Sequence, residues 1–257
     1  MMEWMEEKER ILKLGLEERR EEYHCGTSYV PLSDIPSWAM EELYNSKLSM
    51  DRTGISNEER QKVGRKLLAD FELDDSLDFS EKVSLYPSDI TKLEVDAIVN
   101  AANNSLMGGG GVDGAIHKAA GVHLIEENKT LRGCENGEAK ISGGYKLTAK
   151  CGKDIENILE FKILCSRHHL YSWPKRRKCG NPAYTNCLNM MLKNGLRTIA
   201  FPCMSTGVYG YPQKKACIVA LRTEFDRIIF CLFTQEDTKL YRQRMPIMFP
   251  SKIGGIH

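Results

Sequence analysis

Hydrophobic positions change their pattern near residue 79, and from there on the sequence predicts strands alternating with helices. Four short segments, over 82–86, 95–99, 198–202 and 226–233, have the length and the apolar character of strands. The stretches between them are long enough for helices and include one with clear helical periodicity. This alternation predicts an α/β fold in which helices cover both faces of a central sheet.

The chain before that point has one amphipathic helix and little apolar sequence after it. Over 1–23, apolar residues that include Trp4, Ile11 and Leu16 form a stripe opposite a face of Glu and Arg. Two prolines then interrupt the chain and predict a turn-rich connector. We therefore expect a helical extension with little core of its own, a single domain and a short tail, over 1–78, 79–245 and 246–257.

Composition narrows the class of protein without identifying a partner. Of 257 residues, 42% are hydrophobic and 28% are charged, which suits a globular protein with a buried core. The net charge of +1 gives no argument for a nucleic-acid or membrane partner. The N-terminus is acidic where a targeting peptide would be basic, so we expect a location in the cytoplasm or nucleus. The 9 cysteines are odd in number and irregularly spaced, which favours reduced thiols.

Four consecutive glycines, Gly108 to Gly111, follow the segment 95–99 and precede a helix predicted over 112–120. Glycines allow close approach of a ligand to the backbone, and their N–H groups can form a nest for an anion. The start of the helix adds unsatisfied N–H donors and a partial positive charge. The stretch lacks the lysine of a P-loop, so it predicts a phosphate site of another kind; the alternative is a flexible linker.

A second loop of small residues, Ser205 to Gly210, follows the strand predicted over 198–202. Ligands of open α/β sheets bind beyond the carboxyl ends of the strands. Two such loops at one edge of the sheet could hold a diphosphate from both sides. Tyr209 could then cover a sugar, or it is simply an aromatic residue of the core or the rim.

Four polar residues near the first loop are candidates for the chemistry. The side chains of Asn100 and Asn103 can bind sugar hydroxyls, although they can equally stabilise a turn. Asp113 can cap the helix, or it can orient a water beside the phosphates. His117 lies four residues later on the same helical face, where a structural role is the alternative to a secondary role in the site.

Taken together, these segments match a known family. The shared motifs are Asn100-Ala101-Ala102-Asn103, Gly108 to Gly114, Ile116-His117, Ala119-Ala120-Gly121, Ser88-Asp89-Ile90-Thr91 and Pro202 to Pro212. In these residues the chain resembles the macrodomain family, and within it the MacroD-type mono-ADP-ribosyl hydrolases. The extension over 7–38 also resembles that branch.

The resemblance implies a three-layer fold with a mixed central sheet, and a function. The expected ligand is ADP-ribose, and the expected reactions are cleavage of the ester between ADP-ribose and Asp or Glu side chains of mono-ADP-ribosylated proteins, and deacetylation of O-acetyl-ADP-ribose. It implies a monomer without a cofactor, a metal or a nucleic-acid partner. The implied catalytic residues are Asp113 and Asn103, and the implied binding residues are Asp89, Ile90, Asn100, Gly109, Gly110, Gly111, Val112, Ser205, Thr206, Gly207, Val208 and Tyr209, with His117 as a secondary candidate.

The chain departs from the family pattern over 151–182 and 213–226. The first segment lacks the buried strand that the family has after Lys150, and we predict that 161–165 replaces it in a new register. The second segment leaves a short connection between helix and strand, where such connections normally need more residues.

Three alternatives remain beside the leading one. A non-catalytic reader of ADP-ribosylated proteins would use the same loops without needing Asp113. A degenerate domain with a weakened fold would neither bind ADP-ribose through these loops nor catalyse its release through Asp113. A zinc site would draw on Cys165, His168, His169, Cys179 and Cys187, although their spacing matches no standard finger.

Overall fold

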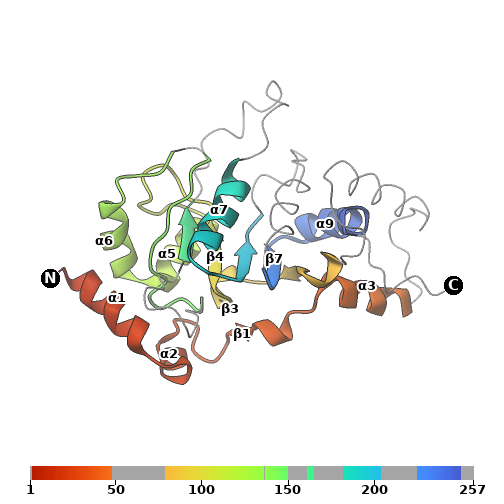
Figure 1. The fold of residues 1–257 in the computed structure, drawn as a ribbon, viewed down its shortest axis with the longest axis horizontal. Coiled ribbons are helices and arrows are strands. Elements are labelled where there is room, and N and C mark those ends of the chain that lie inside the picture. The colour runs from red at the N-terminus through yellow and green to blue at the C-terminus, as the bar shows by residue number, and fades with distance from the viewer. Residues whose placement is uncertain are drawn as a thin grey trace.

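A five-stranded parallel sheet forms the centre of the protein in the computed structural model (Figure 1). The structure describes residues 2–47, 79–135, 137–149, 161–164, 182–203 and 225–249. Strand order in the sheet is β2-β7-β6-β4-β5, and each of these pairings is parallel. The strands are β2 (Val83–Pro87), β4 (Ala97–Asn100), β5 (Phe161–Leu164), β6 (Thr198–Phe201) and β7 (Arg227–Leu232).

Successive residues of the strands enter two different apolar cores, one on each face of the sheet. Val99 lies in one core and Ile98 in the other, as expected because side chains alternate along a strand. The first core contains residues of α7 and α9, and the second contains residues of α5, α6 and α1. These helices are α5 (Val112–Ala120), α6 (Val122–Thr130), α7 (Pro182–Lys193) and α9 (Gln235–Met248). The predicted α/β fold, with its central sheet between two layers of helices, is confirmed.

The segment predicted to replace the missing family strand is a strand in the structure. β5 lies beside β4 with Ala97 opposite Phe161 and Asn100 opposite Leu164. This pairing supplies partners for the backbone of β4, which a lost neighbour would have left unpaired at the edge of the sheet. Residues 213–224 of the second atypical segment lie outside the described residues.

The N-terminal extension contains two helices, α1 (Glu3–Lys13) and α2 (Leu16–Glu22), so the prediction of one helix over 1–23 is wrong. The chain is extended at Leu14 and Gly15, and the carboxylate of Glu18 accepts a hydrogen bond of 2.7 Å from the Gly15 N–H. A glycine with a Glu three residues later is a helix start that competes with continuation of α1. The apolar periodicity continues across the break between α1 and α2, so the sequence pattern alone did not indicate the break.

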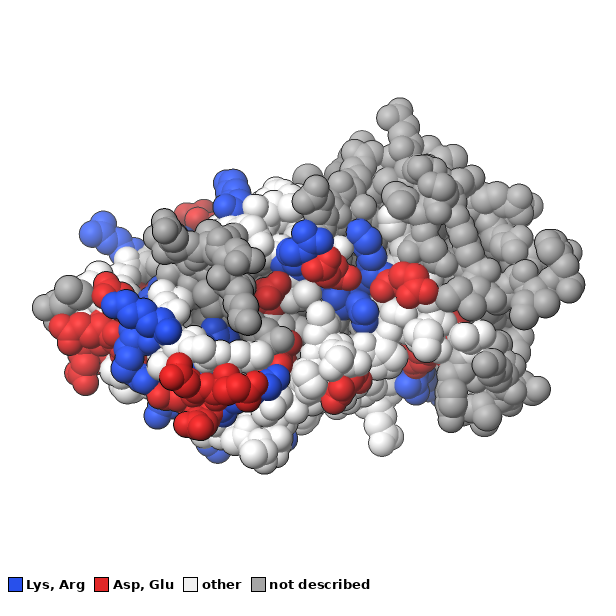
Figure 2. Space-filling view, turned by 60° about the horizontal axis from the view of Figure 1, so that its bottom comes forward, with Lys and Arg blue, Asp and Glu red and all other residues white. Residues whose placement is uncertain are grey.

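Two buried carboxylates of the domain hold the extension. Arg20 on α2 forms two hydrogen bonds, of 2.9 and 3.0 Å, with Glu94, whose side chain is fully buried. Lys8 on α1 pairs with Glu127 on α6. Figure 2 shows charged side chains of both signs gathered over the N-terminal helices. On these helices the exposed Arg10 bridges Glu7 and Glu22.

The rest of the extension shares the core of the domain. Trp38, at the start of α3 (Trp38–Lys47), is 2% exposed and packs in the core that contains α7 and α9. A short parallel pair joins β1 (Val30–Pro31) to β3 (Leu93–Glu94). Short 3₁₀ helices cover Leu32–Asp34 (η1), Phe79–Glu81 (η2) and Ile90–Lys92 (η3).

The C-terminal boundary expected at residue 245 falls inside a helix. α9 continues to Met248, and Phe249 beyond it is 3% exposed within the same core as Tyr241. Phe249, which we had expected in the tail, therefore packs in this core. Among the described residues, no helix has the length and apolar character needed to cross a bilayer.

Candidate functional site

The candidate residues gather at one edge of the sheet because all five strands are parallel and their carboxyl ends coincide. The chain passes from β4 outward to β5 and then returns on the other side of β4 to β6. Such a reversal leaves a crevice at the carboxyl ends of the strands, where ligands of α/β sheets bind. The loop 101–111 leaves this point and leads into α5 (Figure 1).

The glycine loop ends in an uncapped helix start. Gly111 is the N-cap of α5 with φ of 64°, a conformation that glycine adopts without strain, and it has no side chain to bond the first N–H groups of the helix. A side chain added at Gly110 would meet no atom of the described residues within 4 Å. The first turn of α5 thus offers N–H donors beside an open backbone, which is the arrangement that binds phosphate.

Asp113 lies in the first turn of α5 and is only 3% exposed. Asn100, the last residue of β4, donates a hydrogen bond of 2.6 Å from Nδ2 to Oδ1 of Asp113. The other carboxylate oxygen, Oδ2, faces Gly109, where an added Cβ would lie 3.0 Å from it. One oxygen is therefore fixed from the sheet and the other faces the glycine loop.

Asn100 is itself completely buried. Its Oδ1 has no hydrogen-bond partner among the described residues, although a buried acceptor normally has one. The side chain therefore holds Asp113 through Nδ2 and keeps Oδ1 as a buried acceptor.

Asn103 uses its side chain inside the loop. Its Oδ1 accepts hydrogen bonds from the Ser105 hydroxyl at 2.7 Å and the Leu106 N–H at 3.1 Å, and its Nδ2 donates to the Gly108 carbonyl at 2.7 Å. These contacts give it the turn-stabilising role that the sequence left open beside sugar binding. A direct catalytic role for Asn103 remains a prediction.

His117 on α5 contacts both the glycine loop and Asp113. Its ring is mostly buried, with Nε2 3.5 Å from Oδ1 of Asp113. An added Cβ at Gly108, which has φ of 88°, would lie 3.3 Å from the same ring. The histidine thus packs against both the carboxylate and the glycine loop, which is compatible with the structural role and with the secondary role in the site.

Asp89 and Ile90 follow β2 at the same edge of the sheet. Oδ1 of Asp89 accepts hydrogen bonds from the Thr91 N–H at 3.0 Å and the Thr91 hydroxyl at 2.8 Å. These bonds cap the 3₁₀ helix η3 and leave Oδ2 for another donor. Ile90 is 5% exposed and belongs to the core on the α5 side of the sheet.

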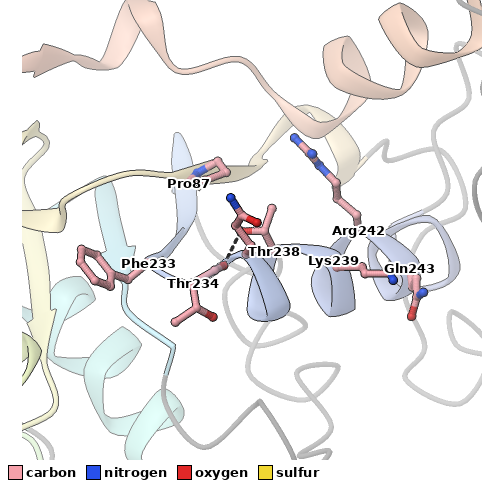
Figure 3. Close-up of a pocket in the computed structure, with 8 residues that line it drawn as sticks. Pro87, Phe233, Thr234, Thr238, Lys239, Arg242 and Gln243 are labelled. Atoms are coloured by element: carbon pink, nitrogen blue, oxygen red, sulfur yellow. Dashed lines mark hydrogen bonds between the residues drawn. The ribbon is translucent and has the colours of Figure 1, made fainter.

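Phe233 is a residue of this edge that sequence reasoning missed. It directly follows β7 and its side chain is 89% exposed, although a large aromatic usually packs against protein. Together with Pro87 it lines a pocket of about 510 Å³ that continues along α9. Figure 3 shows its ring turned away from α9, whereas Arg242 turns towards α3 and pairs with Glu41 at 3.0 Å. The sequence placed Phe233 inside the strand predicted over 226–233, whereas β7 ends at Leu232, so the local pattern gave no signal for its exposure.

The second predicted loop, with Ser205, Thr206, Gly207, Val208 and Tyr209, lies outside the described residues. So do Cys165, His168, His169 and Cys179 of the zinc alternative. Cys187 is buried in the apolar core that contains α7. Within the part of the chain that the structure describes, no three His, Cys, Asp or Glu side chains are grouped as metal ligands.

Comparison with known proteins accounts for this combination of sheet edge, glycine loop and buried aspartate. The pattern of the Macro domain family matches residues 99–161 and 167–220. The chain is 44% identical to the ADP-ribose glycohydrolase MACROD2 of Mus musculus over 96% of its own length and 49% of that protein's. It is 38% identical to the ADP-ribose glycohydrolase MACROD1 of Rattus norvegicus, over 96% of this chain and 89% of the relative.

A solved structure agrees with these sequence matches. The Trypanosoma brucei macrodomain in complex with ADP-ribose superposes with a TM-score of 0.56 at 26% identity, over 92% of this chain and 89% of that one. The chain spans about half the length of the MACROD2 relatives that it matches. With its fold, its glycine loop and these matches, the chain belongs to the macrodomain family.

Proposed function

We propose that this chain binds ADP-ribose at the carboxyl edge of its sheet and hydrolyses the ester that joins ADP-ribose to an acidic side chain of a modified protein. The observation that carries the proposal is the placement of Asp113. Its carboxylate is 3% exposed, is held by Asn100 through one oxygen and presents the other to the glycine loop.

The extent of the edge suits a ligand with a base, a diphosphate and two sugars. Asp89 and Phe233 lie at the ends of β2 and β7, at the opposite end of this edge from the glycine loop. The second carboxylate oxygen of Asp89 and the exposed face of Phe233 are suited to an amino-purine, which they can hydrogen-bond and stack. The N–H groups of Gly109 to Val112 then receive the diphosphate, and the distal ribose extends towards Asp113.

The proposed reaction is displacement of the protein carboxylate by water, with Asp113 as the general base. The water lies between Oδ2 of Asp113 and the distal ribose; its oxygen bonds to the anomeric carbon as the bond from that carbon to the ester oxygen breaks. Its proton passes to Asp113 or to a phosphate oxygen, and the protein carboxylate leaves. Bent binding of the ligand brings the reacting carbon to the water. The same water can attack the acetyl carbonyl of O-acetyl-ADP-ribose.

A reader without catalytic activity is the second candidate. It needs the loop and the sheet edge but has no use for a buried carboxylate beside two phosphates, where like charges repel. The presence of Asp113 and of its hydrogen bond from Asn100 favours the hydrolase. The paired strands and the continuous cores of the described residues argue against a degenerate fold.

The deciding experiment compares the unsubstituted protein with Asp113→Ala. We expect the unsubstituted protein to release ADP-ribose from a glutamate-modified protein and to release heat on binding ADP-ribose. Asp113→Ala should lose turnover by about a hundredfold or more while it still binds ADP-ribose. Asp226→Asn, a half-exposed carboxylate paired with Arg197 away from the site, is the control and should keep both.

Two outcomes would count against the proposal. Binding without any release by the unsubstituted protein favours the reader. Turnover and affinity that both survive in Asp113→Ala remove the assigned role of Asp113. We further propose that the protein acts as a monomer in the cytoplasm or nucleus, where mono-ADP-ribosylated proteins and O-acetyl-ADP-ribose are its substrates.

A further inference from the structure

The loop that precedes the glycines has a strained backbone at a buried residue. Leu106 is fully buried and has φ of 64°, a left-handed conformation that is unfavourable for leucine. A residue keeps such a conformation only when its surroundings impose it. Leu106 stands two residues before Gly108, so its conformation sets the direction in which the chain enters the glycine loop.

The contact that imposes this conformation from outside the loop comes from Asn128 on α6. The Asn128 side chain is fully buried, and its Nδ2 donates a hydrogen bond of 2.7 Å to the carbonyl oxygen of Leu106. A buried carbonyl that loses its donor carries a substantial free-energy cost, so the bond strongly favours the observed orientation of the peptide. Asn103 holds the N–H of the same residue from within the loop.

The helix that carries Asn128 is anchored next to it. Glu127 accepts hydrogen bonds from the Gly143 N–H at 2.6 Å and the Tyr145 hydroxyl at 3.0 Å, and it pairs with Lys8 of the extension. A neighbouring contact runs from the Cys134 N–H to the Asn104 carbonyl at 2.9 Å. The part of α6 that carries Asn128 is therefore held in place by these contacts.

We infer that Asn128 is a positioning residue for the glycine loop, through Leu106, and that it sets the affinity for the diphosphate. This role rests on the proposed function. Asn128 acts on the loop and not on Asp113, because Asp113 is held separately by Asn100 from β4. Loss of the Asn128 donor should therefore weaken ligand binding much more than it slows turnover at saturating substrate.

The test compares Asn128→Leu with Asn194→Leu. Asn194 also donates a 2.7 Å hydrogen bond to a backbone carbonyl, that of Met190, but it precedes β6 and so lies at the opposite edge of the sheet. ADP-ribose affinity is measured by calorimetry, and adenosine affinity by ligand-observed NMR. Adenosine lacks the diphosphate and reports on the other end of the site.

Asn128→Leu should weaken ADP-ribose binding by about tenfold or more, with adenosine binding and the turnover number changed less than about threefold. Asn194→Leu should leave all three unchanged. The amides of Gly108 to Gly111 should also exchange their hydrogens faster in Asn128→Leu alone. Asn128→Ala, which removes the donor without adding a charge, is the second variant.

Unchanged affinity for ADP-ribose in a folded Asn128 variant would overturn the inference. Equal losses for ADP-ribose and adenosine, or failure of both Asn128 variants to fold, would overturn it as well, because each indicates a role in the whole domain rather than in the loop. If instead the unsubstituted protein binds adenosine but not ADP-ribose, the proposed function itself fails.

Discussion

Asn100 and Asp113 join the end of β4 to the start of α5 through a hydrogen bond of 2.6 Å from Nδ2 to Oδ1. Both side chains are buried, so water cannot replace the bond if it is lost. The bond fixes the rotation of the carboxylate and therefore the direction in which Oδ2 faces the glycine loop. The geometry of the proposed reaction thus depends on a residue that need not touch the reacting atoms.

Asn100→Ala should reduce the turnover number by about tenfold to a hundredfold, because the carboxylate loses its only described amide donor and rotates. The affinity for ADP-ribose should change much less, since the N–H groups of the glycine loop remain. Steady-state kinetics on an ADP-ribosylated protein, beside calorimetry, separates the two effects. A variant with normal turnover would show that Asp113 needs no orientation from β4.

Gly114→Ala should destabilise the protein although alanine is the better helix former. A Cβ at this position on α5 would lie 2.5 Å from the carbonyl oxygen of Gly109, so the loop and the helix must move apart. Helix propensity alone predicts a gain of about 1 kcal/mol, whereas the clash predicts a loss of about 1–3 kcal/mol. Urea unfolding gives the sign directly, and a stabilised variant would contradict the close approach.

Phe233→Ser should weaken ADP-ribose binding by about tenfold while it leaves the free energy of unfolding almost unchanged, because stacking on a base contributes about 1–3 kcal/mol. The ring is 89% exposed and contributes little to the core. Met40→Ser, at a 54% exposed position on α3, is the control and should affect neither quantity. Equal affinities in the two variants would remove Phe233 from the ligand site.

Much of the fold and the centre of the site follow from local sequence. The strands β4, β6 and β7 and the helix α5 are short-range patterns, and four consecutive glycines before an amphipathic helix have few structural uses. The position of Asp113 follows from the same stretch, since its distance from the glycines is fixed along the chain.

Other features depend on contacts that no local pattern contains. The Asn103 side chain bonds to the Gly108 carbonyl because the loop brings these two residues together. The His117 ring lies next to Gly108 because α5 packs against the glycine loop. The partner of Asn128 is distant in sequence, at Leu106. The sequence pattern also did not predict the break of the N-terminal helix at Gly15, because both halves keep the same apolar stripe.

The extension should contribute to stability through Lys8 rather than through its surface charges. Lys8→Met leaves the Glu127 carboxylate, whose side chain is 6% exposed, without its cation, and we expect a loss of about 2 kcal/mol. Arg10→Met removes a cation that is 44% exposed between Glu7 and Glu22, and should cost less than about 1 kcal/mol. Urea unfolding of both variants measures the contrast; equal effects would mean that the extension is only loosely attached.

Stability should also fall at alkaline pH because of Cys231 on β7. Burial raises the pKa of its thiol to about 12, and the thiol donates a hydrogen bond of 3.2 Å to the Ser88 carbonyl. In the unfolded chain the pKa is about 8.5, so the unfolded state loses its proton first as pH rises. The contribution of this thiol to the free energy of unfolding is therefore complete below about pH 8.5. Between there and about pH 12 the free energy of unfolding falls by about 1.4 kcal/mol per pH unit.

Cys231→Ala removes this proton from the balance between the folded and unfolded states. Its free energy of unfolding should be lower than that of the unsubstituted protein at pH 7, because a buried side chain is truncated, but it should depend less steeply on pH between 9 and 11. The burial that raises the pKa of Tyr23 acts in the same direction and remains in both proteins, so only the difference between the two slopes reports on Cys231. Identical slopes would show that the thiol is accessible to water in the folded state.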